Sequence, residues 1–393
     1  MKGAIFTAVF TILASSQLFN STAERVVVAT GFEDSLIKKR KFRECNEIRD
    51  RGYSLRKFHR LDDRMFKRSF RMSKPSFYKL LNLIRPHLKK KSVLHAINSS
   101  GSMISDHVCL AVTLRWMAGA SYIDLLFGWD IAPGSFYAED GPLWSTMEAI
   151  NKALNLSFPL HDEEKLRRMA DGYSWYSLHR LKDCVMAVDG WVMRTRAPRR
   201  SETKKVTLYW NRHKCYGMVV MAGCDSKLRY HMFSIVSSGS TNDHLAYDFS
   251  SMKDVIENRL PDPYFCIADE GLTNSRKMLT PWPRSHLDEW KRAFNWGLSR
   301  MRQCIERSFS LLMERWPIFQ RPLRCAMRRW ALVGMVGAKL HNFCIDNAEE
   351  RVIIRCPEDV LPTDNNVPLF NMIDPDDLPA RAHAARGEAN TRQ

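Results

Sequence analysis

The chain has 393 residues, a hydrophobic content of 45% and a formal net charge of +17. This hydrophobic content excludes a largely disordered chain, and the length leaves room for two ordinary domains. So large a positive excess favours an anionic partner, of which nucleic acid is the commonest, over a basic globular protein without a polyanionic partner.

The ten cysteines form no Cys-x-x-Cys pair and show no regular spacing. Several lie inside apolar runs, where a free thiol packs as a small hydrophobic group, so we expect reduced cysteines. Two sets of possible zinc ligands lack the spacing of a structural site, and ordinary core positions are the favoured interpretation. These sets are His213 with Cys215 and Cys224, and His341 with Cys344.

Residues 1–24 are expected to form an apolar leader with the shape of a secretory signal peptide, because Met1-Lys2-Gly3 precedes the apolar run Ala4–Ala14, and the small residues Ser15-Ser16 follow. The run is shorter than a membrane-spanning helix requires, and no membrane partner is expected. The reduced cysteines favour a cytosolic or nuclear setting, and secretion, with a glycosylation sequon at Asn20, is the alternative.

A basic lead-in over residues 25–69 precedes a helical region over residues 70–165. Ser73 is expected to cap the first helix of this region, with Pro75 in its first turn, and Pro86 to end it. Asp106 is expected to cap the next helix.

The stretch from Ser121 to Tyr137 is the best candidate for a helix-turn-helix. A short helix over residues 122–127 would end at Gly128, and a second would run from Pro133 through Leu154. This outline matches the DNA-binding motif. The alternative is an ordinary corner of a compact helical domain, and the second helix carries few Lys or Arg residues.

From Leu181 the pattern changes to strands, and a mixed α/β domain is expected over residues 181–347. A loop at residues 239–243 is expected to cap a helix, Pro317 to close a long basic helix, and a last helix to span residues 327–345. The acidic tail, 348–393, is expected to be loosely ordered. This order suits a mixed sheet flanked by helices, as in a ribonuclease H-like fold. The expected strands are Cys184–Val188, Leu208–Trp210, Tyr216–Ala222, Tyr230–Val236 and Tyr264–Ala268.

Three acids have the arrangement of a metal site. Asp189 and Asp269 each follow a buried apolar run, and Glu306 borders the apolar stripe of the basic helix. Carboxylates at strand ends meet at the edge of an α/β sheet, where hard oxygen ligands can hold two Mg²⁺ ions for phosphoryl transfer.

Each acid also has a simpler interpretation. Asp189 and Asp269 could be turn residues, and Glu306 could pair with Arg302 one helical turn earlier. Glu270 neighbours Asp269, but side-chain alternation would point it the other way, so Asp269 is preferred.

These residues and the motifs around them resemble the Harbinger/PIF superfamily of transposases and their domesticated nuclease relatives. The resemblance runs from Phe70 to about Asn347, and Ile305–Leu312 with Arg315-Trp316 is its most specific segment. The other matching segments are Phe70–Phe77 with Leu80-Leu81 and Arg85-Pro86, Val188-Asp189-Gly190, Gly239–Asp243, Ile267–Asp269 with Leu279–Trp282, and Leu340–Ile345.

The resemblance implies a DDE-type DNA endonuclease on a ribonuclease H-like fold behind an N-terminal helix-turn-helix region. Its catalytic acids and metal ligands would be Asp189, Asp269 and Glu306, with Mg²⁺ or Mn²⁺ as cofactor, in two ions. It also implies DNA as substrate, a nuclear setting and often a Myb-like partner protein, and it leaves a homo-oligomer open. Basic side chains near the acids would bind the DNA backbone: Arg194, Arg196, Lys204, Lys205, Arg212, Lys214, Arg302 and Arg307.

A second hypothesis is a domesticated, catalytically silent DNA-binding or adaptor protein. The chain departs from the family pattern at the second acid, where Ala268 replaces the usual Gly and Glu270-Gly271-Leu272 follows. The basic loop after Asp189 is also irregular.

Overall fold

The structure, a computed structural model, describes residues 51–89, 104–178, 181–285 and 287–349. The predicted leader, most of the basic lead-in and the tail from residue 350 lie outside these ranges. Within them, no helix combines the length and apolar character needed to cross a membrane.

The helical region begins earlier than predicted, because residues 51–60 and 63–70 of the predicted basic lead-in are already helices. Ser73 caps α5, its side chain accepting a hydrogen bond from the Ser76 amide, and Pro75 lies in the first turn. The cap of α7 is Ser105 rather than the predicted Asp106, which is the first residue of the helix. The elements are α3 (Arg51–Arg60), α4 (Asp63–Phe70), α5 (Lys74–Ile84), η2 (Arg85–His87), α7 (Asp106–Met117), α8 (Tyr122–Trp129), α9 (Pro133–Phe136) and α10 (Pro142–Ala153).

The predicted helix-turn-helix boundaries are wrong. Gly128 lies inside α8, and the helix that begins at Pro133 ends after one turn at Phe136. A tight turn follows, in which a Cβ on Gly141 would lie 2.4 Å from the Ser135 carbonyl oxygen, so only glycine fits there. The separate helix α10 then begins, and its side chains from 142 to 147 are buried. That burial makes α10 unsuited to entering a DNA groove.

Within the described residues the sheet has five strands in the order β3-β2-β1-β4-β5. β2 runs antiparallel to β1 and β3, whereas β1, β4 and β5 are parallel. This mixed sheet behind a helical region confirms the predicted α/β class and is the arrangement of a ribonuclease H-like domain. The strands are β1 (Cys184–Arg194), β2 (Gly217–Cys224), β3 (Tyr230–Ser238), β4 (Phe265–Ile267) and β5 (Met278–Leu279).

Two strand predictions need correction. The predicted strand at Leu208–Trp210 is the 3-10 helix η3 (Val206–Tyr209), followed by a single bridge between Trp210 and Tyr216. The two-residue strand β5 was not predicted, because it is too short to leave a pattern in the sequence.

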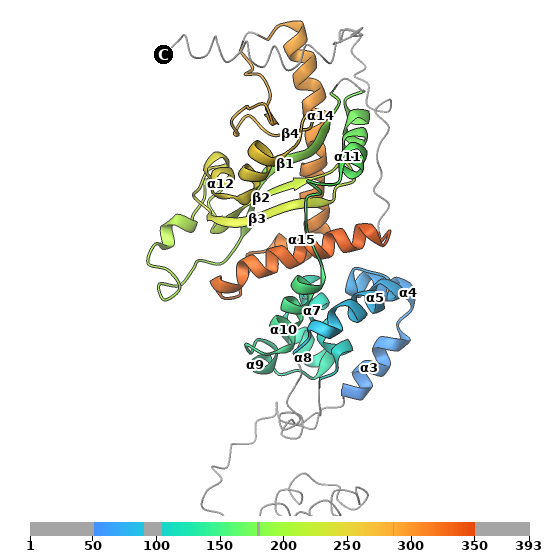
Figure 1. Ribbon diagram of the computed structural model, residues 1–393. Helices are drawn as coiled ribbons and strands as arrows, with labels where there is room; N and C mark the ends of the chain where they lie inside the picture. The colour runs from blue at the N-terminus through green and yellow to red at the C-terminus, as the bar shows by residue number, and fades with distance from the viewer. Residues whose placement is uncertain (1–50, 90–103, 179–180, 286, 350–393) are drawn as a thin grey trace, which may run out of the picture. The chain divides into compact units, whose positions relative to one another are not determined.

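Helices cover both faces of the sheet (Figure 1). α14 and α15 pack on one face, where Met301, Ile305 and Leu312 of the predicted stripe are fully buried. α12, α13 and the first half of α11 pack on the other face. The elements are α11 (Glu163–Tyr176), α12 (Asp243–Phe249), α13 (Ser251–Asp254), the π-helix η4 (Val255–Arg259), α14 (Glu289–Arg315), η5 (Pro317–Gln320), η6 (Met327–Arg329) and α15 (Trp330–Asp346).

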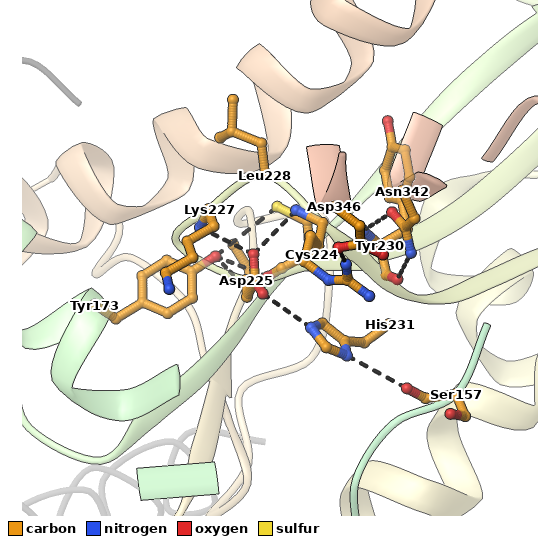
Figure 2. Close-up of polar contacts among 12 residues, drawn as sticks. Ser157, Tyr173, Cys224, Asp225, Lys227, Leu228, Tyr230, His231, Asn342 and Asp346 are labelled. Carbon is orange, nitrogen blue, oxygen red and sulfur yellow. Dashed lines mark hydrogen bonds and ion pairs between the residues drawn. The ribbon is translucent and has the colours of Figure 1, made fainter. Parts of the chain in front are cut away.

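Polar contacts fix the β2–β3 hairpin against its neighbours (Figure 2). The Tyr173 hydroxyl of α11 donates to the Cys224 carbonyl at 2.8 Å. The Asn342 side chain of α15 accepts from the Tyr230 amide at 2.9 Å and donates to its carbonyl at 2.7 Å. In the turn, Asp225 contacts His231 at 3.0 Å. These bonds satisfy backbone groups at the hairpin end and hold the sheet that carries the site in place.

Candidate functional site

Asp189 lies inside a strand, not at its end. β1 continues to Arg194 and pairs with β2 along this length, Asp189 lying opposite Ala222. On its other side the pairing with β4 stops at Ala187 and Ile267. The predicted strand end is therefore wrong, but Asp189 still lies at an open edge, because β4 is short and β1 is long.

The register of the parallel strands brings Asp269 beside Asp189. Ala187 pairs with Ile267, and each aspartate lies two residues further along its own chain. Residues two apart on a strand share a face, so both aspartates lie on the face of Ala187 and Ile267. That face belongs to the core cluster that also contains Ile305 of α14.

Arg302 of α14 lies among the three predicted acids. Its Nη2 is 3.4 Å from Asp189 Oδ2 and 3.4 Å from Glu306 Oε1. Its Nη1 is 3.4 Å from Asp269 Oδ1, so Asp269 rather than Glu270 makes this contact. The structure thus brings Asp189, Asp269 and Glu306 together around a single guanidinium group. The simpler pairing of Glu306 with Arg302 also exists, but the two strand aspartates share it.

The acids differ in burial, and Asp189 is the least exposed. Its side chain is 20% exposed, compared with 50% for Asp269 and 57% for Glu306. The pKa of Asp189 is raised to about 6, mainly by burial and less by the charges of Asp269 and Asp243, while Arg302 and the Gly190 amide offset part of this effect. Arg302 supplies one positive charge to the three carboxylates that it contacts.

Asp243 is a fourth acid near the site, which sequence reasoning missed as a site residue. A Cβ on Gly190 would lie 2.4 Å from Asp243 Oδ1, so the glycine after Asp189 makes room for this carboxylate on the opposite face of the sheet. Arg212 lies 3.6 Å from Asp243. The signal available in the sequence is the Gly239–Asp243 motif, which by itself predicts only a capping loop.

The site offers carboxylate oxygens, the ligands that a hard divalent cation prefers. Three carboxylates from separate elements contact the Arg302 guanidinium. In their present positions, however, no three His, Cys, Asp or Glu side chains of the described ranges lie close enough to share a metal ion. Arg302 lies where the three acids converge, so the acids could bind a metal ion there only if Arg302 moved away. The cysteines of the described ranges form no disulfides, and all of them except Cys215 are buried.

The predicted DNA-binding residues fall into two groups. Arg194, Lys204, Lys205, Arg212 and Lys214 are exposed, on or just beyond the end of β1 and in the connection to β2. The other three are partly buried.

Arg196 in that second group donates to both oxygens of Glu202, at 2.6 and 2.8 Å. Arg302 contacts the three acids, and Arg307 interacts with Tyr176. The first group is therefore the better candidate for contact with a polyanion.

A family model described as DDE superfamily endonuclease matches residues 188–342. The matched range contains the three acids, Arg302 and the whole described connection between β1 and β2. No curated protein and no solved structure matches the chain. Residues 188–342 are therefore identified, by this match and by the ribonuclease H-like sheet, as a DDE superfamily endonuclease domain.

Proposed function

We propose that this protein is a metal-dependent DNA endonuclease of the Harbinger transposase type, with Asp189, Asp269 and Glu306 as its catalytic acids. The observation that carries the proposal is the convergence of these carboxylates, from β1, from the end of β4 and from α14, on one guanidinium. Such a group of acids is otherwise hard to explain, because like charges in one place destabilise a fold.

Each acid has a role that follows from its position. Asp189 shares Nη2 of Arg302 with Glu306 and is the most buried of the three, so it would be shared by two Mg²⁺ or Mn²⁺ ions. Asp269 and Glu306 would each hold one ion. Bound metal would activate a water molecule or a DNA 3′-hydroxyl as the nucleophile, and it would stabilise the leaving oxygen of the phosphodiester.

The connection between β1 and β2 is suited to bind the DNA beside the acids. Arg212 reaches Asp243, whose carboxylate lies over Gly190, so this loop adjoins the site. Trp210 in the same loop is 46% exposed and packs edge-on against Tyr216, with ring centroids 4.9 Å apart. An exposed aromatic ring among basic side chains suits contact with phosphates and bases.

The test is cleavage of element-end DNA in Mg²⁺ or Mn²⁺ by the wild type and by Asp189→Ala. We expect the variant to lose more than the roughly 10–100-fold that removal of an outer-shell partner costs at a metal site. Glu164→Ala is the matched control, because Glu164 is an exposed acid of α11 that pairs only with Arg168 among the ion pairs of the described part. Equal cleavage by the wild type and Asp189→Ala would overturn the assignment.

The second candidate is a catalytically silent DNA-binding or adaptor protein. One observation favours it: Arg302 already neutralises part of the acid cluster. On this alternative DNA binding would be steeply salt-dependent, independent of metal and without product. On either proposal a nuclear setting and a Myb-like partner protein are expected from the Harbinger resemblance.

A further inference from the structure

We infer that Arg302 is an exchangeable internal cation. It holds the three acids together without metal, and it leaves them for a DNA phosphate when metal binds. DNA and metal would then bind cooperatively, because a DNA phosphate draws Arg302 away from the acids, and a bound metal ion leaves Arg302 available for the phosphate. The inference rests on the proposed function and adds to it a coupling between substrate and cofactor.

The first step is that Arg302 and a metal ion compete for the same oxygens. The guanidinium contacts an oxygen of each acid, and its side chain is only 15% exposed. In its present position the guanidinium occupies the point where the three acids converge, and its positive charge would repel a metal ion bound there. Metal ions held by these acids therefore require Arg302 to move.

The second step is that Arg302 is held loosely enough to exchange. Its three contacts are all 3.4 Å long, near the limit of useful geometry for a hydrogen bond. Arg196, by contrast, holds both oxygens of Glu202 at 2.6 and 2.8 Å. The Nε of Arg302 is buried and, within the described residues, has no hydrogen-bond partner. The present position of Arg302 thus leaves part of its hydrogen-bonding capacity unused.

The third step is that a DNA phosphate is a suitable new partner. Guanidinium binds phosphate with two parallel hydrogen bonds, a geometry it does not achieve with any of the three acids here. The phosphate to be cut must lie against the acids, within reach of Arg302. By thermodynamic linkage, DNA would then tighten metal binding by the same factor by which metal tightens DNA binding.

The experiment measures Mn²⁺ affinity by electron paramagnetic resonance, on the full chain, with and without a short DNA duplex. For the wild type we expect DNA to tighten Mn²⁺ binding about tenfold, within the range typical of coupled sites. Arg302→Gln should bind Mn²⁺ about tenfold more tightly than the wild type without DNA, and DNA should then add little. Arg302→Lys keeps the charge but cannot bind a phosphate with two parallel hydrogen bonds, so without DNA it should bind Mn²⁺ as weakly as the wild type does, and DNA should tighten that binding less.

Arg168→Gln is the matched control, because Arg168 is an exposed arginine of α11 that pairs with a glutamate one turn away. Thermal unfolding would establish that each variant is folded. The inference would be overturned if Arg302→Gln bound Mn²⁺ no more tightly than the wild type does. It would also be overturned if DNA tightened Mn²⁺ binding equally in the wild type and in Arg302→Gln. Metal-dependent cleavage by the wild type would in that case leave the proposed function intact. Conversely, if DNA tightened Mn²⁺ binding as expected but the wild type cut no DNA, only the catalytic proposal would be refuted.

Discussion

Asp189 shows how a single side chain can be identified from sequence while its surroundings cannot. The apolar run before it and the glycine after it marked a carboxylate at a sheet edge, which the structure places there. The reason for Gly190 is the carboxylate of Asp243 from a later helix, a contact that no local pattern contains. The position of Arg302 likewise depends on side chains from three elements meeting in space.

His341 provides a prediction at the same scale. It is fully buried, its Nε2 donates to the Leu228 carbonyl at 2.8 Å, and burial lowers its pKa to about 3. The unfolded chain binds a proton near pH 6.5 and the folded chain does not, so this residue lowers stability as pH falls from about 6.5 towards 3.

Urea unfolding of the wild type and His341→Gln at pH 7 and pH 5 would measure this effect. The stability advantage of the wild type should shrink by about 2 kcal/mol at the lower pH. The raised pKa of Asp189 has the opposite effect, because it makes the fold less stable as pH rises through 6. This contribution is the same in both proteins, so it cancels in the difference between their free energies of unfolding. A difference that stays constant with pH would show that His341 is not held neutral.

At the scale of elements, long periodic segments were predictable and short or interrupted ones were not. The apolar stripe of α14 and both strands of the β2–β3 hairpin followed from their patterns, because each buries one face on the core. The helix α11 was not predicted. The supposed helix from Pro133 to Leu154 is interrupted between Phe136 and Pro142 by a tight turn, in which Gly141 lies against the backbone carbonyls of Ser135, Phe136 and Ala138.

Two glycines in helices should respond in opposite directions to alanine. A Cβ on Gly337 of α15 would lie 2.5 Å from two ring carbons of Phe319, which is buried and cannot easily move. Overpacking of this kind costs about 1–3 kcal/mol, more than the gain of up to about 1 kcal/mol in helix propensity.

Gly128 of α8 is the matched control, because a Cβ there meets no atom within 4 Å. Gly128→Ala should therefore raise the free energy of unfolding by about 0.5–1 kcal/mol. Urea unfolding of both variants measures the contrast. Stabilisation by Gly337→Ala would contradict the packing of α15 on η5.

At the scale of the whole molecule, the order of helices and strands was enough to predict a mixed α/β domain behind a helical region. The strand order β3-β2-β1-β4-β5 was not predictable from the chain, since pairing between distant strands leaves little local trace. Net charge was the other molecular property visible in the sequence, and an excess of +17 pointed to a polyanion before any site was known.

The charge leads to a prediction about salt dependence. Replacing Lys204, Lys205, Arg212 and Lys214 by alanine should reduce the slope of log affinity for DNA against log salt, by up to about 0.9 for each phosphate that the protein no longer neutralises. Exposed Lys165 and Arg168 of α11 provide the control substitution. Binding measured by fluorescence anisotropy over a range of NaCl concentrations gives the slope. An unchanged slope would mean that the β1–β2 connection does not contact the DNA backbone.

The most direct test of the central claim, that Asp189 is a metal ligand of a DNA-cutting site, is a change of metal preference. Asp189→Cys replaces a hard oxygen ligand with a softer sulfur, which disfavours Mg²⁺ more than Mn²⁺. DNA cleavage by this variant should be lost in Mg²⁺ and partly restored in Mn²⁺, while the wild type cuts in both. Wild-type cleavage by Asp189→Cys in Mg²⁺, or residual cleavage with no preference for Mn²⁺, would contradict the account.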